Sequence, residues 1–198
     1  MIGTDKEDYT IRLLSQTTWW KRLLDVQRPY RKHLQHLQLG LVLDVGCGIG
    51  RNLLNIAGSA RGVGVDHNVH SVVIAKARGL IAFTPAEFRA SSYAKAPGFD
   101  SLLLSHVAEH LQYKEAISLL EEYVCYLRSG GRVVLITPQE AGYHSDQTHV
   151  TFVDPHLAAM ILKGCGLRLS GQYSFPLPRL FGKVFKYNEF VTIGEKPG

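Results

Sequence analysis

The feature that most constrains the fold is a glycine-rich turn at the end of an apolar run, LVLDVGCGIG at residues 41–50. Its glycines stand at alternate positions, and a helical pattern follows them. Glycine permits a sharp backbone turn and lets a ligand approach the main chain closely. The helix behind the turn offers free N–H groups to a polar or anionic ligand. This segment therefore predicts a strand, a ligand-binding loop and a helix.

Similar apolar runs alternate with helical patterns from Leu41 to the end of the chain. Strands are predicted at 41–46, 62–66, 80–85, 99–106, 130–138, 167–174 and 188–196. The central runs are continuously apolar, which is typical of parallel strands covered on both faces. The connection 175–187 is too short for a crossover helix, so the last two strands are expected to pair antiparallel. We predict an α/β fold with a seven-stranded, mostly parallel sheet, an antiparallel last strand and helices on both faces.

Two helices in the second half of the chain have clear signals at their ends. One is predicted at 114–127, where the glycines after Ser129 stop it. The other begins at Asp154-Pro155, an N-cap followed by proline, and ends at Gly164 and Gly166. The residues expected to face inward are Ile117, Leu120, Val124 and Leu127 in the first helix and Leu157, Met160 and Ile161 in the second.

The residues before the first strand are predicted to be helical but are too few for a core of their own. We expect residues 1–40 to form a helical cover over the active site, with Pro29 dividing two helical pieces, and residues 41–198 to form the main domain. One of Trp19 and Trp20 is expected to pack inward and the other to lie near the pocket. Tyr9, Arg12 and Gln16 are expected to close over the ligand.

The composition excludes several classes of protein. Hydrophobic residues make up 45% and charged residues 20% of the chain, which excludes wholesale disorder. No apolar run approaches the ~18 residues of a spanning helix, and the polar N-terminus is no signal peptide, so no membrane partner is expected. The cysteines Cys47, Cys125 and Cys165 cannot all pair, which indicates reduced thiols in a cytoplasmic protein.

An acidic residue after the second strand indicates what the loop binds. Asp66 lies 20 residues after Gly46, the distance at which a carboxylate accepts hydrogen bonds from ribose hydroxyls. Together with the loop, it specifies a bound adenosine. The loop is G-x-G-x-G rather than the dinucleotide pattern G-x-G-x-x-G, so there is no pyrophosphate to hold. Asp44, two residues before the first glycine, suits a cation such as an α-ammonium group.

Five segments in order resemble the class I S-adenosylmethionine-dependent methyltransferases. They are LDVGCGIGRNL, GVGVD, FDSLLLSHVAEHL, SGGRVVLITP and HVTFVDPHLAAMILKGCGL. The resemblance implies a Rossmann-like fold and S-adenosylmethionine as the cofactor. It implies that Gly46, Cys47 and Gly48 line the methionine part, with Cys47 a space-filler, and that Asp66 holds the ribose. It further assigns His67 and Asn68 to the ribose and adenine, Ala86, Glu87 and Phe88 to the adenine, and Ser105 and His106 to the neighbourhood of the sulfonium.

A narrower resemblance, carried by SQTTWWKRLLDVQ and SDQTHVTFVDP, is to the methylmannose polysaccharide O-methyltransferases. It implies a small hydroxyl substrate, a sugar and specifically the 1-OH of a methylated mannoside. A hydroxyl acceptor needs a general base, and histidine suits neutral pH. His144 is the first candidate, with Asp146 to orient it; His149 and Glu109 are the others. His110 is expected to anchor backbone.

A metal is a further possibility at the same residues. Glu109, Asp146 and His149 have suitable ligand types, and Mg²⁺ would favour the carboxylates, but their spacing matches no dedicated motif. The 179–187 segment is basic and aromatic and could contact the substrate or be a solvated hairpin.

Two other functions stay open. One is methylation of a quinone ring or of another small molecule at nitrogen or oxygen. The other is nucleic-acid binding, as an RNA methyltransferase or an inactive relative, because the net charge of +5 is concentrated at both ends of the chain. No run reaches 5–6 like charges and no RNA-binding module is appended, which favours a solvated surface without a nucleic-acid partner. The sequence leaves the oligomeric state open.

Overall fold

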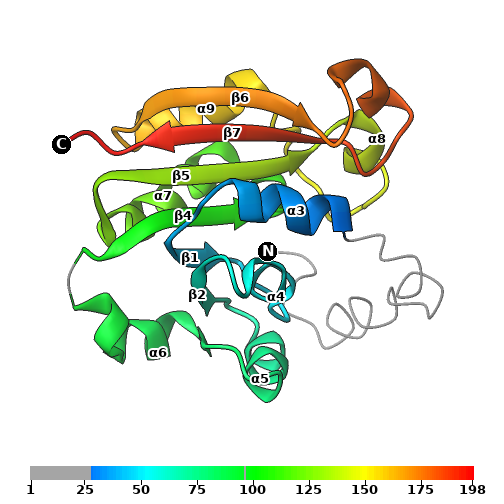
Figure 1. Ribbon diagram of the computed structural model, residues 1–198. Coiled ribbons are helices and arrows are strands. Elements are labelled where there is room, and N and C mark those ends of the chain that lie inside the picture. Colours follow the sequence, from blue (N-terminus) through cyan, green and yellow to red (C-terminus); the bar gives the residue numbers. More distant parts are fainter. Residues whose placement is uncertain (1–27, 96) are drawn as a thin grey trace. The chain divides into compact units, whose positions relative to one another are not determined.

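The computed structural model describes residues 28–95 and 97–198 (Figure 1). The chain divides into two compact units, with the boundary in the sequence between Ala94 and Lys95. The expectations for Tyr9, Arg12, Gln16, Trp19 and Trp20 fall outside the described residues. Among the residues that are described, no helix is long and apolar enough to cross a membrane.

The first unit consists of three parallel strands and the helices that connect them. Strand β2 pairs with β1 and with β3, parallel in both cases. A helix at the start of the described chain agrees with the helical piece predicted after Pro29. The elements are α3 (Arg28–His36), β1 (Leu41–Val45), α4 (Arg51–Ile56), β2 (Arg61–Val65), α5 (Val69–Ala77), β3 (Ala82–Phe83), α6 (Pro85–Ala90) and the 3₁₀ turn η1 (Ser92–Ala94).

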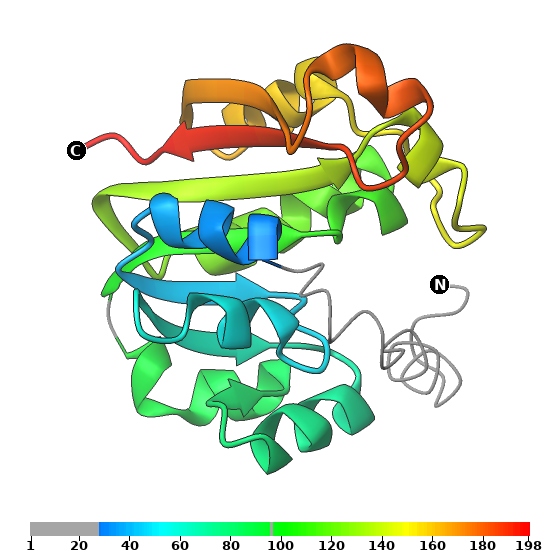
Figure 2. The same ribbon diagram turned by 45° about the vertical axis from the view of Figure 1, so that its right-hand side comes forward.

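The second unit combines parallel and antiparallel pairing. Strand β4 runs parallel to β5, whereas β7 is antiparallel to both β5 and β6. Helices α7 and α9 lie side by side on one face of these strands (Figures 1 and 2). The elements are β4 (Phe99–Ser105), η2 (Ala108–His110), α7 (Tyr113–Val124), β5 (Leu127–Pro138), α8 (Glu140–Tyr143), α9 (Pro155–Gly164), β6 (Arg168–Phe175), η3 (Arg179–Lys183) and β7 (Glu189–Glu195).

The strands of the described chain form one seven-stranded sheet in the order β3-β2-β1-β4-β5-β7-β6. This confirms the predicted fold: a mostly parallel sheet in which the last strand is antiparallel. The core explains why the apolar runs are continuous. Residues 101–105 of β4 and 133–138 of β5 are buried without a break, so both faces of these strands are covered.

The predictions were wrong in two regions of the chain, in ways that follow from backbone hydrogen bonding. Strand β3 has two residues instead of six, because the Leu80 N–H closes the end of α5 on the Ala75 carbonyl and Thr84 caps α6. Leu127 is not on a helix: α7 ends at Val124, and Leu127 pairs with Phe99 in an adjacent strand. Residues 127–131 were predicted to include the end of the helix, but they form the first part of β5.

The predicted inward face of α9 was also shifted. Met160 is 42% exposed, whereas Ala158, Ile161 and Leu162 are buried. The cap itself was predicted correctly, since the Asp154 carboxylate accepts a hydrogen bond from the Leu157 N–H with Pro155 in the first turn.

Candidate cofactor site and polar cluster

The glycine-rich loop makes its turn with backbone angles that favour glycine. Gly46, Gly48 and Gly50 have φ of 77°, 53° and 81°. The N–H groups of Gly46 and Cys47 both donate to the Val65 carbonyl, at 2.8 and 3.1 Å, which fixes the loop to the end of β2. A Cβ at Gly50 would lie 2.2 Å from Leu80 Cδ1, so the Leu80 side chain would have to shift, and the positive φ also disfavours a side chain there.

Asp66 connects the end of β2 to this loop. Its Oδ2 accepts from the Gly48 N–H at 2.7 Å and its Oδ1 from the Asn68 N–H at 2.8 Å. The carboxylate is nearly buried. Each oxygen has a second lone pair, so the side chain can still accept hydrogen bonds from the two hydroxyls of a ribose.

Asp44, on β1, is fully buried and only partly hydrogen-bonded. Its Oδ1 lies 3.5 Å from Asn52 Nδ2, and its Oδ2 has no hydrogen-bond partner among the residues that the structure describes. Burial raises the pKa of Asp44 to about 7; the Asn52 amide opposes this and the charge of Asp66 adds to it. A cationic ligand group would supply the missing partner, so this carboxylate fits the ammonium of S-adenosylmethionine.

Cys47 fills space inside the loop, as expected. A Cβ at Gly64 would lie 2.6 Å from Cys47 Sγ, so the thiol occupies the room that the missing side chain leaves. Burial raises the pKa of the Cys47 thiol well above its ordinary value, which keeps the group protonated.

The residues expected near the ribose and adenine lie in different environments. Asn68 is buried and caps α5, accepting from the N–H groups of His70 and Ser71, while the His67 side chain is 54% exposed. Glu87 closes a capping box with Thr84 and forms an ion pair with Lys76 at 2.9 Å; the Thr84 N–H and then Lys76 lower the pKa of Glu87.

Phe88 is completely buried and faces Phe83 at 6.4 Å between ring centroids. Its ring lies on the buried side of α6, and neither face of the ring is accessible to a ligand. The periodicity of a short helix could not show this, because an apolar residue beside a ligand and one in the core follow the same pattern.

In the second unit, His106 is held between two carboxylates. Its Nδ1 lies 3.1 Å from Glu109 Oε1 and its Nε2 lies 2.6 Å from Glu189 Oε1. Burial opposes the charged form, but the two carboxylates outweigh it and raise the pKa of His106 to about 10. His106 also has a positive φ of 58°, a conformation that this arrangement stabilises. Both ring nitrogens of His106 are therefore occupied by carboxylate oxygens. Ser105, beside it, is nearly buried at the end of β4.

Glu189 was missed by the sequence analysis. It is the first residue of β7 and pairs with Pro138, the last residue of β5. Because β7 is antiparallel to β5, its start lies at the carboxyl end of β5, where polar site residues gather in such sheets. The sequence did contain a signal for Glu189, because an acidic residue stands at the start of an otherwise largely apolar strand.

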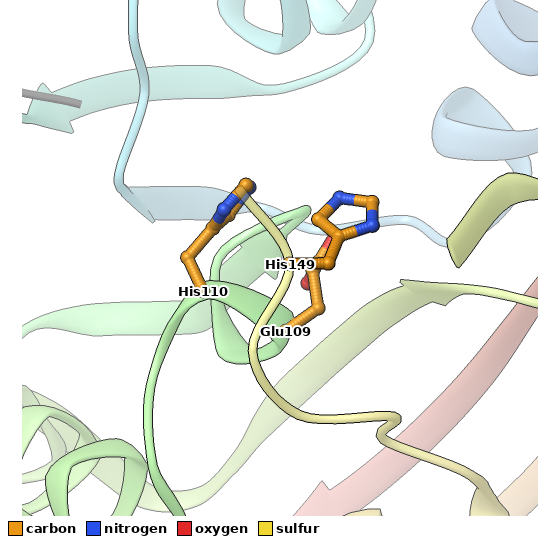
Figure 3. Close-up of side chains that lie close together, drawn as sticks. All are labelled: Glu109, His110 and His149. Carbon is orange, nitrogen blue, oxygen red and sulfur yellow. The ribbon is translucent and has the colours of Figure 1, made fainter. Parts of the chain in front are cut away.

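The loop after α8 is tied to η2 through backbone groups. The N–H groups of Val150 and Thr151 donate to the Glu109 carbonyl at 2.9 and 3.1 Å, and Thr151 Oγ1 donates to the Leu111 carbonyl. This brings His149 beside Glu109 and His110 (Figure 3). Burial lowers the pKa of His110.

His144 and Asp146 are not joined to each other. His144 is exposed at the end of α8, in ring contact with Tyr143 at 5.4 Å. Asp146 Oδ1 instead accepts from the N–H and the hydroxyl of Thr148, at 3.0 and 2.8 Å. The expected orientation of His144 by Asp146 is thus wrong for the described part of the chain, because the nearer Thr148 donors form a turn with this carboxylate.

Comparison with known proteins finds one family model that resembles the glycine-rich segment. Residues 42–131 match the sequence model of a family described as "Methyltransferase domain". The matched segment is 90 of the 198 residues of the chain. No curated protein matches the sequence significantly.

Solved structures of methyltransferases share the fold. An S-adenosylmethionine-dependent methyltransferase from Archaeoglobus fulgidus is 17% identical, with 90% of this chain and 100% of that chain covered and a TM-score of 0.63. Magnesium protoporphyrin IX methyltransferase from Synechocystis, solved with bound S-adenosylmethionine, is 14% identical, with 98% and 93% covered and a TM-score of 0.62. A Haloferax volcanii methyltransferase, solved with its activator Trm112, is 16% identical, with 87% and 92% covered and a TM-score of 0.64.

The partial family match and the shared fold both resemble S-adenosylmethionine-dependent methyltransferases. The matched segment contains the glycine-rich loop, Asp44 and Asp66, the residues whose geometry fits a methionine-linked adenosine. The segment that matches the family model therefore contains the residues predicted to bind the cofactor.

Proposed function

We propose that the protein transfers a methyl group from S-adenosylmethionine to a hydroxyl group of a small molecule, with a sugar as the favoured class and His144 as the proton acceptor. S-adenosylmethionine, when bound, supplies an activated methyl group. For the cofactor, Asp66 is assigned to the ribose hydroxyls, Asp44 to the ammonium group, and the loop from Gly46 to Gly50 to close approach of the main chain.

The proton balance of the reaction explains why a base is needed. As the new carbon–oxygen bond forms and the carbon–sulfur bond breaks, the acceptor hydroxyl loses its proton. A hydroxyl is a poor nucleophile until that proton is taken, and a positioned base contributes roughly 10²- to 10⁴-fold in rate. Histidine is suited to this at neutral pH.

The observation that carries the proposal is the free imidazole of His144. Within the described part of the chain, neither of its ring nitrogens has a hydrogen-bond partner, and the side chain is exposed. His106, by contrast, has both ring nitrogens occupied by the carboxylates of Glu109 and Glu189. His149 and Glu109 are the other candidates. His149 Nδ1 contacts the Tyr143 carbonyl oxygen, and Glu109 Oε1 contacts His106.

The favoured acceptor is the 1-OH of a methylated mannoside. It rests on the resemblance of the SDQTHVTFVDP segment to sugar O-methyltransferases. An anomeric hydroxyl is also more acidic than other sugar hydroxyls, which makes the task of a histidine base easier.

The test is an activity screen with labelled S-adenosylmethionine, sugars and quinols as acceptors, with and without Mg²⁺. His144→Ala should lower turnover by about 10²-fold or more while leaving the affinity for S-adenosylhomocysteine unchanged. His156→Ala, which removes another exposed histidine, on α9, is the matched control and should keep full turnover. Full activity of the His144 variant would move the base to His149 or Glu109, and methylation of quinols alone would reject the sugar.

A further inference from the structure

Glu109, His110 and His149 form a group of metal-ligand type in the second unit (Figure 3). One ligand atom from each of the three side chains lies within 4.8 Å of the others. The Glu109 side chain is completely buried, and its Oε2 has no hydrogen-bond partner in residues 28–95 and 97–198. A buried carboxylate oxygen without a partner is costly, so a missing cation or donor is expected beside it.

Both imidazoles are oriented by backbone carbonyls through the same ring nitrogen. His149 Nδ1 lies 2.7 Å from the Tyr143 carbonyl oxygen, and His110 Nδ1 lies 3.1 Å from the Thr148 carbonyl oxygen. A carbonyl only accepts, so Nδ1 of each ring carries the hydrogen. In the neutral rings Nε2 is then the nitrogen with the free lone pair, the arrangement that second-sphere carbonyls impose on histidines that bind metals.

The ligand geometry is fixed in advance. The hydrogen bonds from Val150 and Thr151 to the Glu109 carbonyl hold the His149 loop against η2 without any metal. Glu109 Oε1 is occupied by His106, which leaves Oε2 as the oxygen available to a cation. The site therefore offers two nitrogens and one oxygen from a rigid frame.

We propose that Glu109, His110 and His149 bind a divalent transition-metal ion, of which Zn²⁺ is the reference. Two imidazoles and a carboxylate form a donor set that suits Zn²⁺ and its neighbours, and three protein ligands leave a position open for water or an oxygen of a substrate. Mg²⁺ prefers an all-oxygen site and is disfavoured by two imidazoles. The site differs from the magnesium site considered from the sequence, because His110 replaces Asp146, whose Oδ1 is hydrogen-bonded to Thr148.

The site is independent of the methyl acceptor. If the proposed function holds as well, a dication with an open position would lower the pKa of a hydroxyl bound to it, which links the metal to methyl transfer. Metal binding can be measured without cofactor or acceptor, so failure of one proposal leaves the other open to its own test.

The experiment uses the full chain without an affinity tag, stripped with a chelator and titrated with Zn²⁺ or Mg²⁺ in competition with a chelating dye. Zn²⁺ is expected to bind in a 1:1 ratio and much more tightly than Mg²⁺. His149→Ala and His110→Ala should each weaken Zn²⁺ binding roughly 10- to 100-fold. His156→Ala is the control and should bind Zn²⁺ like the unchanged chain.

A second readout separates these ligands from adventitious sites on the surface. The visible spectrum of bound Co²⁺ should show imidazole coordination and should be lost in His149→Ala, with circular dichroism confirming that this variant is folded. Glu109→Gln should alter the spectrum too. Zn²⁺ binding unchanged in both histidine variants, preference for Mg²⁺, or no stoichiometric binding at all would overturn the proposal.

Discussion

Asp44 and Asp66 lie in one unit of the protein, and both are buried, but their hydrogen bonding differs. Both oxygens of Asp66 accept main-chain N–H groups, whereas Asp44 has one oxygen without a partner among the residues described. A satisfied buried carboxylate stabilises the loop it binds, while an unsatisfied one is poised for a ligand. We therefore expect Asp66 to matter for both loop stability and binding, and Asp44 mainly for binding a cation.

The raised pKa of Asp44 makes a prediction about the pH dependence of cofactor binding. With a pKa of about 7 in the free protein, the carboxyl is protonated in acid and must lose its proton to pair with an ammonium group. The affinity for S-adenosylhomocysteine should therefore rise with pH up to about 7 and level off above it. Calorimetric titrations between pH 5.5 and 8.5 in two buffers would measure both the affinity and the proton released.

Two variants make this prediction specific. Asp44→Asn should bind more weakly and lose most of the pH dependence, because no proton is released. Asp66→Ala should bind more weakly at every pH, because it removes hydrogen bonds rather than the titrating group. An affinity that does not change with pH in the unchanged protein would show that Asp44 does not face the ligand's cation.

At the scale of elements, the two glycines on either side of α4 share a positive φ but differ in their surroundings. Gly50 opens α4 with φ of 81°, and a Cβ there would meet Leu80 Cδ1 at 2.2 Å. Gly58 has a similar φ of 87°, but nothing lies within 4 Å of a Cβ at that position. Comparing a substitution at Gly50 with one at Gly58 therefore distinguishes the cost of backbone strain from the cost of steric overlap.

Gly50→Ala should lower the free energy of unfolding by about 2 to 4 kcal/mol, and Gly58→Ala by only about 1 kcal/mol. The difference reflects the overlap with Leu80, since the backbone strain is shared. Urea denaturation of both variants measures it. Equal losses in the two variants would mean that Leu80 moves aside freely.

The bounds of the elements could be predicted where burial is continuous and could not where capping decides them. The runs that became β1, β4 and β7 were placed to within about a residue, and most residues of these three strands are buried. Strand β3 was predicted too long, since its flanking residues close α5 and cap α6 instead. Leu127 was assigned to a helix because an apolar residue between a helix and a strand fits the periodicity of both.

More of the candidate cofactor site than of the histidine and glutamate contacts in the second unit could be predicted from the sequence. Asp44 and the glycines belong to one continuous segment and Asp66 to a fixed offset from it, so local sequence is sufficient. The contact of His106 with Glu189 joins residues 83 positions apart, and it depends on the direction of β7. The pairing of His110 with His149 depends likewise on how a loop folds back, which sequence spacing does not reveal.

On the scale of the whole molecule, that long-range contact makes stability depend on pH. His106 has a pKa of about 10 in the folded protein and an ordinary value near 6.5 when unfolded. The folded state therefore binds more protons between these values, and stability falls as pH rises from about 6.5 to about 10. Below pH 6.5 the full contribution of the ion pairs with Glu109 and Glu189 is present.

The measurement is the melting temperature of the metal-free protein between pH 6 and 10, with a chelator present. His106→Asn is the informative variant, because asparagine tolerates a positive φ and cannot titrate in this range. The decline in melting temperature over this range should be smaller in the variant than in the unchanged protein. Parallel curves would mean that the imidazole is not charged in the folded state.

The register shift in β6 has a consequence for self-association. This strand is the last in the order of the sheet, and its pairing with β7 slips between Leu169 and Gly171. A regular edge strand has free backbone groups with which a strand of another molecule can pair. A bulge twists the edge strand and disrupts such pairing. We expect the irregularity to hinder polymerisation of the protein through this margin, even though Leu169 and Tyr173 expose apolar surface along it.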